Sequence, residues 1–499
     1  MRIRHRARGG GLRVTDLFGT LAALARDEVD DFPALRAHQR APWHAFAVQV
    51  AVLALLRERT EELLDDAGEW ERLLLALTPD HPDGEAWRLV VDDWSKPALL
   101  QPPGMDPALR ENAKAKRAET PDALDMLLTA RNHDVKSERM GRASDDDWLF
   151  ALVSLQTQEG QMGAGNYGIS RMNGGYGARV ALGLQPPEPS LGRSFVRDVR
   201  RLVAATDDTD GLALVWLAPW DGASSIPFNK LHPLYVEVCR PVRLVGSSDA
   251  ITGAILGNSK TPRIAAKERH GVTGDPWAPI VQDRSKSWGV SAGGFGYKQM
   301  VTLLDRSKVE RPLLAIPNTS DGAAGLTLVA RAVTRGQGKT EGYHERHVRV
   351  PAAGTGLLSA GSDRLAQTAN DRTKDAGDVT NILRHALRAL FQGGPDEVRH
   401  DDDATNAKLV PYIQRFDREV DAVFFDSAFW AAATETGEDV TRRHMLAWRE
   451  RLHGIAANVL REAEFAAPRN AMRRYRALAR ARSVFDGRMR MFLGEGASQ

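Results

Sequence analysis

The chain has almost no cysteine. Its 499 residues include a single one, Cys239, which excludes an internal disulfide and any zinc site built from several cysteines. This composition is typical of proteins in a reducing compartment, so we expect a cytoplasmic protein. We also expect no metal and no other cofactor.

The chain also lacks an excess of charge of either sign. It carries 67 Lys and Arg residues against 65 Asp and Glu residues, a formal net charge of +2. A field of one sign over the whole protein is therefore excluded. Any contact with a polyanion must come from local groups of cations and donors.

Long hydrophobic runs are absent as well. The most apolar stretch, residues 45–56, spans twelve residues and includes Gln49, whereas a transmembrane helix needs about 20 apolar residues. We therefore expect a buried helix there and no membrane contact. With 42% hydrophobic residues in 499, the chain is long enough for two or three domains with substantial cores.

The first part of the chain, residues 1–360, mixes helical and strand-like patterns and predicts an irregular α+β domain. The helices expected here cover residues 45–64 and 121–130, and the strands cover residues 213–217, 234–238 and 327–333. Gly, Pro and polar residues are frequent in residues 219–227 and 246–279. Long loops are expected there, and long loops in a compact domain usually carry function.

The second part, residues 361–499, has helical periodicity throughout. Four stripes of apolar residues recur at helical spacing and predict a four-helix bundle whose stripes form the core. The stripes are Val379, Ile382, Leu383, Ala386 and Leu390; Ile413, Phe416, Val420, Val423 and Phe424; Met445, Trp448, Leu452, Ile455 and Val459; and Met472, Tyr475, Leu478 and Phe485. Residues 469–490 also carry eight arginines against one acid, Asp486. This basic face is either a solvated helix surface or a contact for nucleic acid or an acidic partner.

Catalytic motifs are not found in complete form. Gly338, Lys339 and Thr340 resemble the end of a phosphate-binding P-loop, but Val333 occupies the position of the required earlier glycine. His344 and His347 are separated by two residues, one fewer than in the zinc-binding motif H-E-x-x-H. The sequence therefore predicts neither ATP hydrolysis nor metal binding at these two motifs.

The most distinctive segment lies between Gly163 and Gly177. It has six glycines in fifteen residues, and no Asp or Glu occurs from Gly160 to Pro187. Glycines allow a close approach of the backbone to a ligand, and the segment also carries side-chain donors that we expect to face an anion. These donors are Asn166, Arg171, Asn173 and Arg179. A surface loop made of tight turns explains the same glycines without function.

Three further polar segments are not explained by packing. Residues 132–136 connect two expected helices, residues 267–271 form a basic turn, and residues 335–343 follow a strand with glycines around Gln337. An amide and flanking cations at a loop tip are suited to reading the minor groove or replacing a base-pair partner. Plain turns also account for each segment taken alone, so nucleic-acid binding and simple surface structure both stay open.

Taken together, these segments resemble CasA, the large subunit of the type I-E CRISPR Cascade complex. The resemblance extends from about residue 35 to the end of the chain. The motifs that carry it are Glu119 to Asp125, Asn132 to Asp134, Gly163 to Gly175, Ser225 to Pro227, His232 to Tyr235 and Arg335 to Gly342.

The resemblance implies a non-catalytic DNA-recognition subunit. Such a subunit reads the protospacer-adjacent motif of double-stranded target DNA from the minor groove, begins duplex unwinding and R-loop formation, and helps to recruit a helicase-nuclease. Its partners would be target DNA, CRISPR RNA, the Cascade backbone and small subunits, and the helicase-nuclease in trans.

The resemblance also assigns roles to residues. A glycine loop, a minor-groove cation and a glutamine wedge would contact DNA, and a polar connector would lie near the motif and the 5′ handle of the guide. The DNA-contacting residues would be Gly163, Ala164, Gly165 and Asn166; Lys267 or Arg269; and Gly336, Gln337, Gly338 and Lys339. The connector would be Asn132, His133 and Lys136.

Two departures from the family pattern are visible. The usual N-terminal strand with a Trp-Ile-Pro sequence is not recognisable in residues 1–14, and residues 246–262 contain no cysteine for the zinc knuckle of some relatives. The alternative function is an enzyme that acts on a phosphorylated small molecule held by the glycine loop. That alternative lacks an identifiable base or nucleophile.

Overall fold

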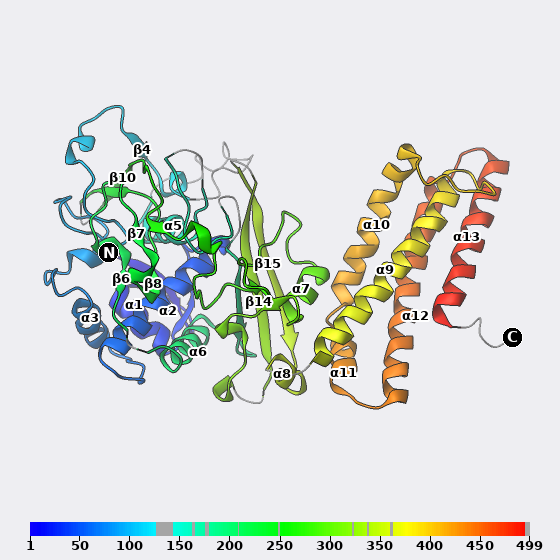
Figure 1. The fold of residues 1–499 in the computed structure, drawn as a ribbon, viewed down its shortest axis with the longest axis horizontal. Coiled ribbons are helices and arrows are strands. Elements are labelled where there is room, and N and C mark those ends of the chain that lie inside the picture. The colour runs from blue at the N-terminus through cyan, green and yellow to red at the C-terminus, as the bar shows by residue number, and fades with distance from the viewer. Residues whose placement is uncertain are drawn as a thin grey trace. The chain divides into compact units, whose positions relative to one another are not determined.

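The computed structural model forms two compact units (Figure 1). The first consists of Met1–Phe295 and Arg306–Val348, and the second of Gly296–Asp305 and Arg349–Gln499. The structure describes residues 1–125, 143–161, 165–174, 179–207, 209–247, 250–321, 324–336, 339–359 and 363–494. A domain boundary near residue 360 stays a prediction, and each unit is described separately below.

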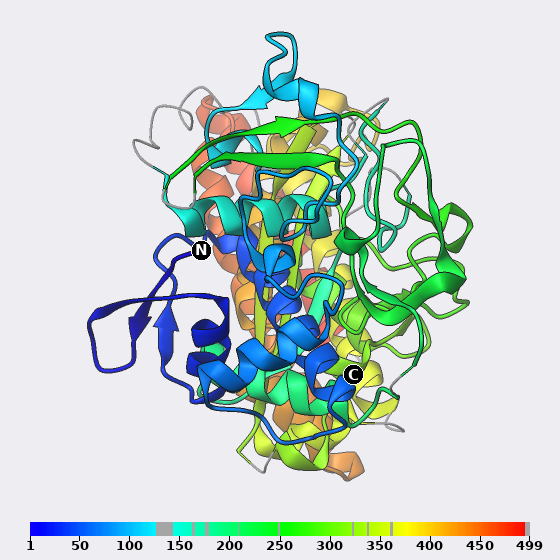
Figure 2. The same cartoon turned by 90° about the vertical axis from the view of Figure 1, so that its left-hand side faces the viewer.

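The first unit begins with a small antiparallel sheet of order β2-β1-β3 and the helix α1 (Figure 2). The bounds are β1 (Ile3–Ala7), β2 (Leu12–Thr15), α1 (Leu17–Ala25) and β3 (Val29–Asp31). A strand pair therefore forms here without the Trp-Ile-Pro sequence. Its turn contains Gly9, Gly10 and Gly11, whose φ angles of 89°, 100° and 93° favour glycine.

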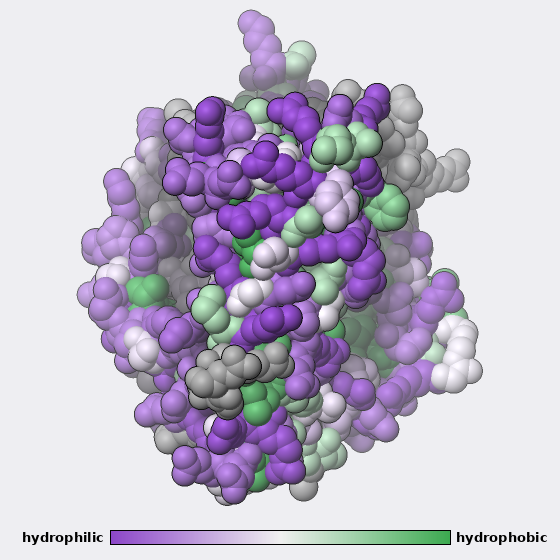
Figure 3. All heavy atoms as spheres, turned by 90° about the vertical axis from the view of Figure 1, so that its right-hand side faces the viewer, coloured by the Kyte–Doolittle hydropathy of each residue, from purple (hydrophilic) through white to green (hydrophobic). Residues whose placement is uncertain are grey.

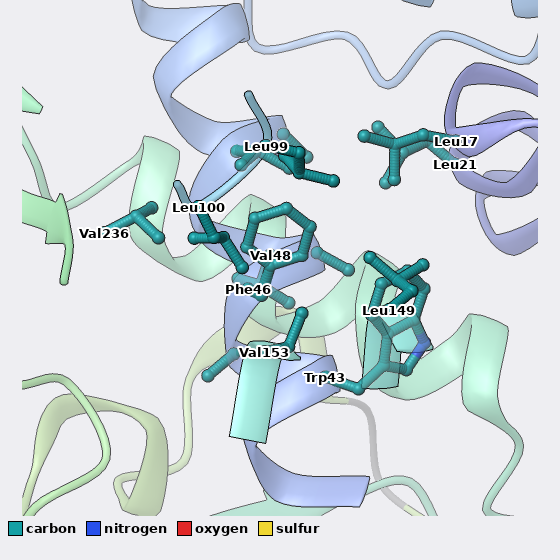
Figure 4. Packing of buried hydrophobic residues seen from close by; sticks show 14 of the residues in the cluster. Leu17, Leu21, Trp43, Phe46, Val48, Leu99, Leu100, Leu149, Val153 and Val236 are labelled. Carbon is teal, nitrogen blue, oxygen red and sulfur yellow. The ribbon is translucent and has the colours of Figure 1, made fainter. Parts of the chain in front are cut away.

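The core of this unit is built around helix α2 (Arg40–Arg57). All residues from Ala45 to Leu56 are buried, so the expectation of a buried helix is confirmed. Figure 4 shows side chains of α2, among them Trp43 and Phe46, packed with Leu149 and Val153. The last two residues belong to α5 (Asp145–Gln158), which begins with a capping box from Ser144 to Asp147.

Two more helices, α3 (Ala67–Ala76) and α6 (Leu191–Val203), pack against α2 and α1. The helix expected over residues 121–130 begins as a 3-10 turn at Pro121–Ala123, and residues 126–130 lie outside the described residues. None of the helices in the described ranges combines the length and apolar content that a membrane span needs.

The remaining strands of the first unit form small open sheets. One has the order β4-β10-β9, with β4 (Lys116–Ala118), β9 (Val242–Gly246) and β10 (Ile251–Leu256). Another has the order β15-β14-β5, with β5 (Ala181–Gln185), β14 (Leu326–Gly336) and β15 (Lys339–Val350). Three two-stranded pairs are β6 (Leu212–Leu214) with β8 (Leu231–Val236), β7 (Ile226–Pro227) with β11 (Ile264–Ala265), and β12 (Ile280–Val281) with β13 (Val309–Glu310).

The predicted strands are recovered to different degrees. Residues 327–333 lie inside β14, as expected, and residues 234–238 overlap β8. The run at residues 213–217 is a strand only to Leu214, because a 3-10 turn covers Val215–Leu217. The expectation of a mixed α+β first part is confirmed.

The second unit is helical. Its long helices are α9 (Asp363–Phe391), α10 (Asp403–Val423), α12 (Glu438–Ala463) and α13 (Ala471–Leu493), and its shorter ones are α7 (Tyr297–Leu304), α8 (Ala352–Leu358) and α11 (Ser427–Thr434). The four long helices confirm the predicted bundle. Gly393 and Gly394, with φ angles of 84° and 73°, follow the end of α9, as their sequence predicts.

The apolar stripe predicted for the last helix is wrong in part. Met472 is 82% exposed and Tyr475 is 78% exposed, and Met445 of the third stripe is 37% exposed. The buried face of α13 is instead made of Ala477, Ala481, Phe485 and Met489. These residues follow one another at intervals of four, a single helix face that lies roughly opposite Tyr475 because each residue turns the helix by about 100°.

The outer side of α13 is basic. Figure 3 views the side of the second unit on which this helix lies, and hydrophilic side chains surround scattered apolar ones there. Several of its arginines have local partners: Arg482 pairs with Glu464 at 2.6 Å, and Arg476 lies 3.4 Å from Asp396. Such exposed pairs contribute little to stability, so the charge remains available to a partner.

Candidate nucleic-acid interface

The residues predicted to contact DNA belong to three segments of the first unit. We call them the glycine segment (residues 159–179), the basic turn (residues 267–271) and the hairpin end (residues 334–341). The structure describes Gly165, Asn166, Lys267 and Arg269 fully, and the backbone of Gly336 and Lys339 at the ends of β14 and β15. The other predicted residues lie outside the described residues: Gly163, Ala164, Gln337 and Gly338, and the connector residues Asn132, His133 and Lys136.

The glycine segment leaves α5 through a narrow neck. The backbone N–H of Ile169 donates to the carbonyl of Glu159 at 2.9 Å. A Cβ atom at Gly168 would lie 2.7 Å from the backbone of Gly160 and Gln161, a distance that packed atoms do not tolerate. Gly168 is therefore required by packing at the neck.

Gly165 has a different role. Its φ angle of 80° lies in the left-handed region, and its carbonyl accepts a hydrogen bond from the backbone N–H of Ser259 at 3.0 Å. The neighbouring Asn166 is half-buried, and its side chain makes no hydrogen bond to any described residue. Its amide is thus free to contact a ligand.

The arginines of the glycine segment do not face a ligand, contrary to the sequence prediction. Arg171 is 2% exposed and Arg179 is 4% exposed. Arg171 donates to the carbonyl of Tyr235 at 2.7 Å and lies 4.1 Å from the centre of its ring. Arg179 forms two hydrogen bonds with Asp275, at 2.7 and 3.2 Å.

Asp275 thereby joins the two arginines, because Arg171 lies 3.4 Å from the same carboxylate. Burial alone raises the pKa of Asp275, but Arg179 and Arg171 outweigh it and hold the pKa below its usual value. A paired, buried carboxylate of this kind fixes backbone geometry. The arginines therefore anchor the glycine segment to the body of the unit.

A second set of polar contacts anchors Ser170. Its backbone N–H donates to Glu237 at 2.6 Å, and its hydroxyl lies 2.7 Å from that of Tyr235. Burial raises the pKa of Tyr235 to about 12 and also raises the pKa of Glu237. Both groups are deeply buried, and they act in positioning the segment.

The basic turn packs against the glycine segment. Gly271 has a φ angle of 83°, and a Cβ there would lie 2.8 Å from the carbonyl carbon of Met172 and 3.0 Å from the backbone nitrogen of Asn173. It would also collide with the hydroxyl of Ser287. Two segments almost one hundred residues apart in sequence are thus in direct backbone contact.

The two cations of the turn differ in their surroundings. Both are exposed, but the guanidinium of Arg269 lies 4.0 Å from the centre of the Phe228 ring, an attractive cation–π contact. The ammonium group of Lys267 makes no hydrogen bond or ion pair with the described part of the chain. Both side chains can therefore reach a ligand, and only that of Arg269 is held by an aromatic ring.

The hairpin end contacts the neck of the glycine segment. Arg335, near the end of β14, forms a buried ion pair with Glu159. Arg240 donates to the carbonyl of Gly160 at 2.8 Å. The hairpin end therefore contacts the glycine segment at its neck, and the basic turn contacts it at Met172 and Asn173.

The nucleophile and the histidines that the sequence offers in this part of the chain are held by local contacts. Burial raises the pKa of the Cys239 thiol to about 12, which makes it a poor nucleophile. His344 lies 3.1 Å from the hydroxyl of Thr334, and His347 lies 2.6 Å from Glu345. In the described ranges, no three His, Cys, Asp or Glu side chains are grouped so that they could hold a metal ion.

The anchoring residues Glu159, Tyr235, Glu237, Arg240 and Asp275 were not predicted from the sequence. Each is an ordinary residue in its local sequence, and its partner is far away; Arg179 and Asp275, for example, are 96 positions apart. Only the fold brings them together.

The comparisons with known proteins concern the fold. No protein-family model and no curated protein sequence matches the chain. Among solved structures, CasA from Thermus thermophilus is similar with a TM-score of 0.67 at 17% identity, covering 99% of this chain and 98% of that one. Cse1 from Acidimicrobium ferrooxidans has a TM-score of 0.63 at 13% identity, with 99% of each chain covered.

A third structure, Cse1 from Thermobifida fusca, has a TM-score of 0.62 at 14% identity and covers 99% of this chain and 97% of that one. At these identities the similarity concerns the fold, and it spans both units. The similarity of fold confirms the resemblance to CasA found in the sequence. The chain has the CasA (Cse1) fold over nearly its whole length.

Proposed function

We propose that the chain is the large subunit of a type I-E CRISPR Cascade complex. In this role it recognises the protospacer-adjacent motif of double-stranded target DNA through the minor groove and starts duplex unwinding. The observation that carries the proposal is that the basic turn and the hairpin end, both distant in sequence, each contact the glycine segment. Solved structures with the same fold are named as CRISPR-associated proteins.

Each segment has a proposed task. Gly163, Ala164, Gly165 and Asn166 approach the DNA backbone and base edges closely, because glycines present no side chain and Asn166 has a free amide. Lys267 or Arg269 enters the minor groove or contacts its phosphates, and the guanidinium of Arg269 lies on the ring of Phe228. Glycine-flanked Gln337 at the hairpin end, with Lys339 beside it, acts as the wedge that separates the first base pair.

The remaining partners follow from the same proposal. The connector with Asn132, His133 and Lys136 lies near the motif and the guide's 5′ handle. The helical second unit docks on backbone and small subunits of a cytoplasmic complex that contains CRISPR RNA, and its basic helix α13 supplies charge for these contacts. The complex recruits a helicase-nuclease in trans, because this chain has no catalytic role of its own.

The alternative function, an enzyme for a phosphorylated small molecule, loses its main support. It needs the cations of the glycine segment to hold a phosphate, and Arg171 and Arg179 are buried against Asp275 instead. A competing acid at the same place disfavours an anion there.

Lys267→Ala is expected to weaken binding of target duplex by the assembled complex and to reduce its salt dependence. The slope of log affinity against log salt should fall by about 0.9 for each phosphate that the variant no longer neutralises. Gel-shift titrations at four or more salt concentrations measure this slope. Lys114→Ala removes another exposed lysine, outside the three segments, and serves as the control; equal slopes for the Lys267 variant and wild type would contradict a phosphate contact.

Gln337→Ala is expected to slow the opening of a fully paired target more than that of a target with mismatched first base pairs. The wedge compensates part of the unstacking cost of a few kcal/mol per step, and premelted DNA does not incur that cost. Stopped-flow fluorescence of a base analogue next to the motif measures both rates. The same slowing on both targets would indicate a general defect in place of a wedge.

A further inference from the structure

Glu159, the first residue of the glycine segment, contacts both Ile169 within that segment and Arg335 of the hairpin end. Its carbonyl closes the neck of the glycine segment by accepting from Ile169 at 2.9 Å. Its side chain forms the ion pair with Arg335, at the end of β14. The two partners of this ion pair are 176 positions apart in sequence.

The ion pair is fully enclosed. The side chain of Glu159 is 5% exposed and that of Arg335 is 2% exposed. Burial raises the pKa of Glu159, opposed by the positive charges of Arg335 and Arg240. Arg240 also donates to the carbonyl of Gly160, the next residue along the chain, so two arginines surround one turn of backbone.

Stability alone does not explain this arrangement. Replacing a buried ion pair by apolar side chains of similar volume is often neutral or stabilising, because the charges no longer have to be desolvated. In some proteins a buried polar or charged group fixes one geometry, as a single buried Asn fixes the register of a coiled coil. The pair is therefore suited to fixing where the hairpin end lies relative to the glycine segment.

We propose that Glu159 is a positioning residue that fixes the distance between the glycine segment and the hairpin end. If the proposed function holds, this fixed distance places the wedge at the first base pair when the glycine segment is seated on the motif. Motif recognition and duplex opening are then coupled through one buried ion pair.

The distance can be measured without DNA. Asn166→Cys places a spin label on the glycine segment, and Glu341→Cys places one on the β15 strand of the hairpin end. The natural Cys239 is buried and does not react readily. Pulsed electron resonance on the full chain then gives the distribution of label distances. We expect a narrow distribution in the parent protein and a clearly broader one in Glu159→Gln.

Glu85→Gln is the control. Glu85 is 7% exposed and pairs with Lys96 within the same unit, but the side chain of Lys96 is 44% exposed, so the substitution removes a carboxylate from a less enclosed ion pair elsewhere. It should leave the label distribution unchanged. A distribution in Glu159→Gln as narrow as in the parent would overturn the proposal, and so would equal broadening in the control.

A second variant tests the proposal if Glu159→Gln does not fold. Glu159→Leu with Arg335→Met replaces the pair by apolar side chains and leaves no unpaired buried charge. This double variant should fold and still show the broad distribution. A folded double variant with the narrow distribution would overturn the proposal.

The functional consequence is tested in the assembled complex. Glu159→Gln should slow opening of a fully paired target by about 10-fold while premelted target opens at close to the wild-type rate, since the coupling energy between two sites is typically 1–3 kcal/mol. A wild-type complex that opens no DNA would refute the proposed function only, because the label distances still decide the positioning role. Equal slowing on both targets would overturn the coupling.

Discussion

Asp275→Asn is expected to lower the free energy of unfolding of the first unit by about 3–5 kcal/mol, because it leaves two buried guanidinium groups without their carboxylate. Arg179 and Arg171 both contact this side chain, which is 1% exposed. Urea unfolding followed by tryptophan fluorescence at pH 7 measures the loss. Asp210→Asn, at an exposed position, is the control and should stay within about 0.5 kcal/mol of wild type.

The same variant should change the acid dependence of stability. The pKa of Asp275 is lowered in the folded chain, so its ionised form stabilises the fold above the unfolded-state pKa of about 3.9. That stabilisation is lost as the pH falls from there through the folded-state pKa. Wild type should therefore lose stability more steeply than Asp275→Asn below about pH 4, and parallel curves would contradict the ion-pair network.

Gly271→Ala is expected to separate the basic turn from the glycine segment. Alanine at a φ angle of 83° is strained, and its Cβ would lie 2.8 Å from the backbone of Met172. Left-handed strain of about 1–2 kcal/mol and overpacking of about 1–3 kcal/mol should together lower stability by about 2–5 kcal/mol. Target affinity of the complex should fall by at least about 10-fold, since displaced contacts act together.

Gly274→Ala provides a closely matched control for that prediction. Gly274 lies three positions further along with a φ angle of 77°, but nothing lies within 4 Å of the added Cβ. It should show the strain of about 1–2 kcal/mol alone, with unchanged DNA affinity. Equal DNA affinity and equal thermal stability of the two variants would show that the contact between the basic turn and the glycine segment contributes neither to DNA binding nor to stability.

Much of the fold follows from local patterns in the sequence. The buried helix around residues 45–56 and the long helices of the second unit have strong periodicity, and the glycines at residues 393 and 394 end α9 where expected. The predicted stripe of α13 is wrong in part because alanine is small and only weakly hydrophobic. Ala477 and Ala481 therefore do not stand out as core residues among the neighbouring arginines. Met472 and Tyr475 are larger and more apolar, yet they lie on the exposed side.

The site was predictable only in outline. The segments that carry glycines, amides and cations were identified, because these residue types are unusual at such density. The roles of Arg171 and Arg179 were not, because a cation next to glycines has the same appearance in sequence whether it binds a ligand or a buried acid. The deciding partners, Tyr235 and Asp275, are 64 and 96 positions away.

The most direct test of the central claim is a selection of target DNA by the assembled complex. A complex with a fixed guide is offered duplexes that contain the matching target and randomised flanking nucleotides, and bound duplexes are sequenced. Wild type should enrich a short motif on one side of the target. Asn166→Ala, which removes an amide proposed to face base edges, should lose most of that enrichment, while Lys114→Ala keeps it. Bound duplexes with flanks as random as the input pool would contradict recognition of a protospacer-adjacent motif by this chain.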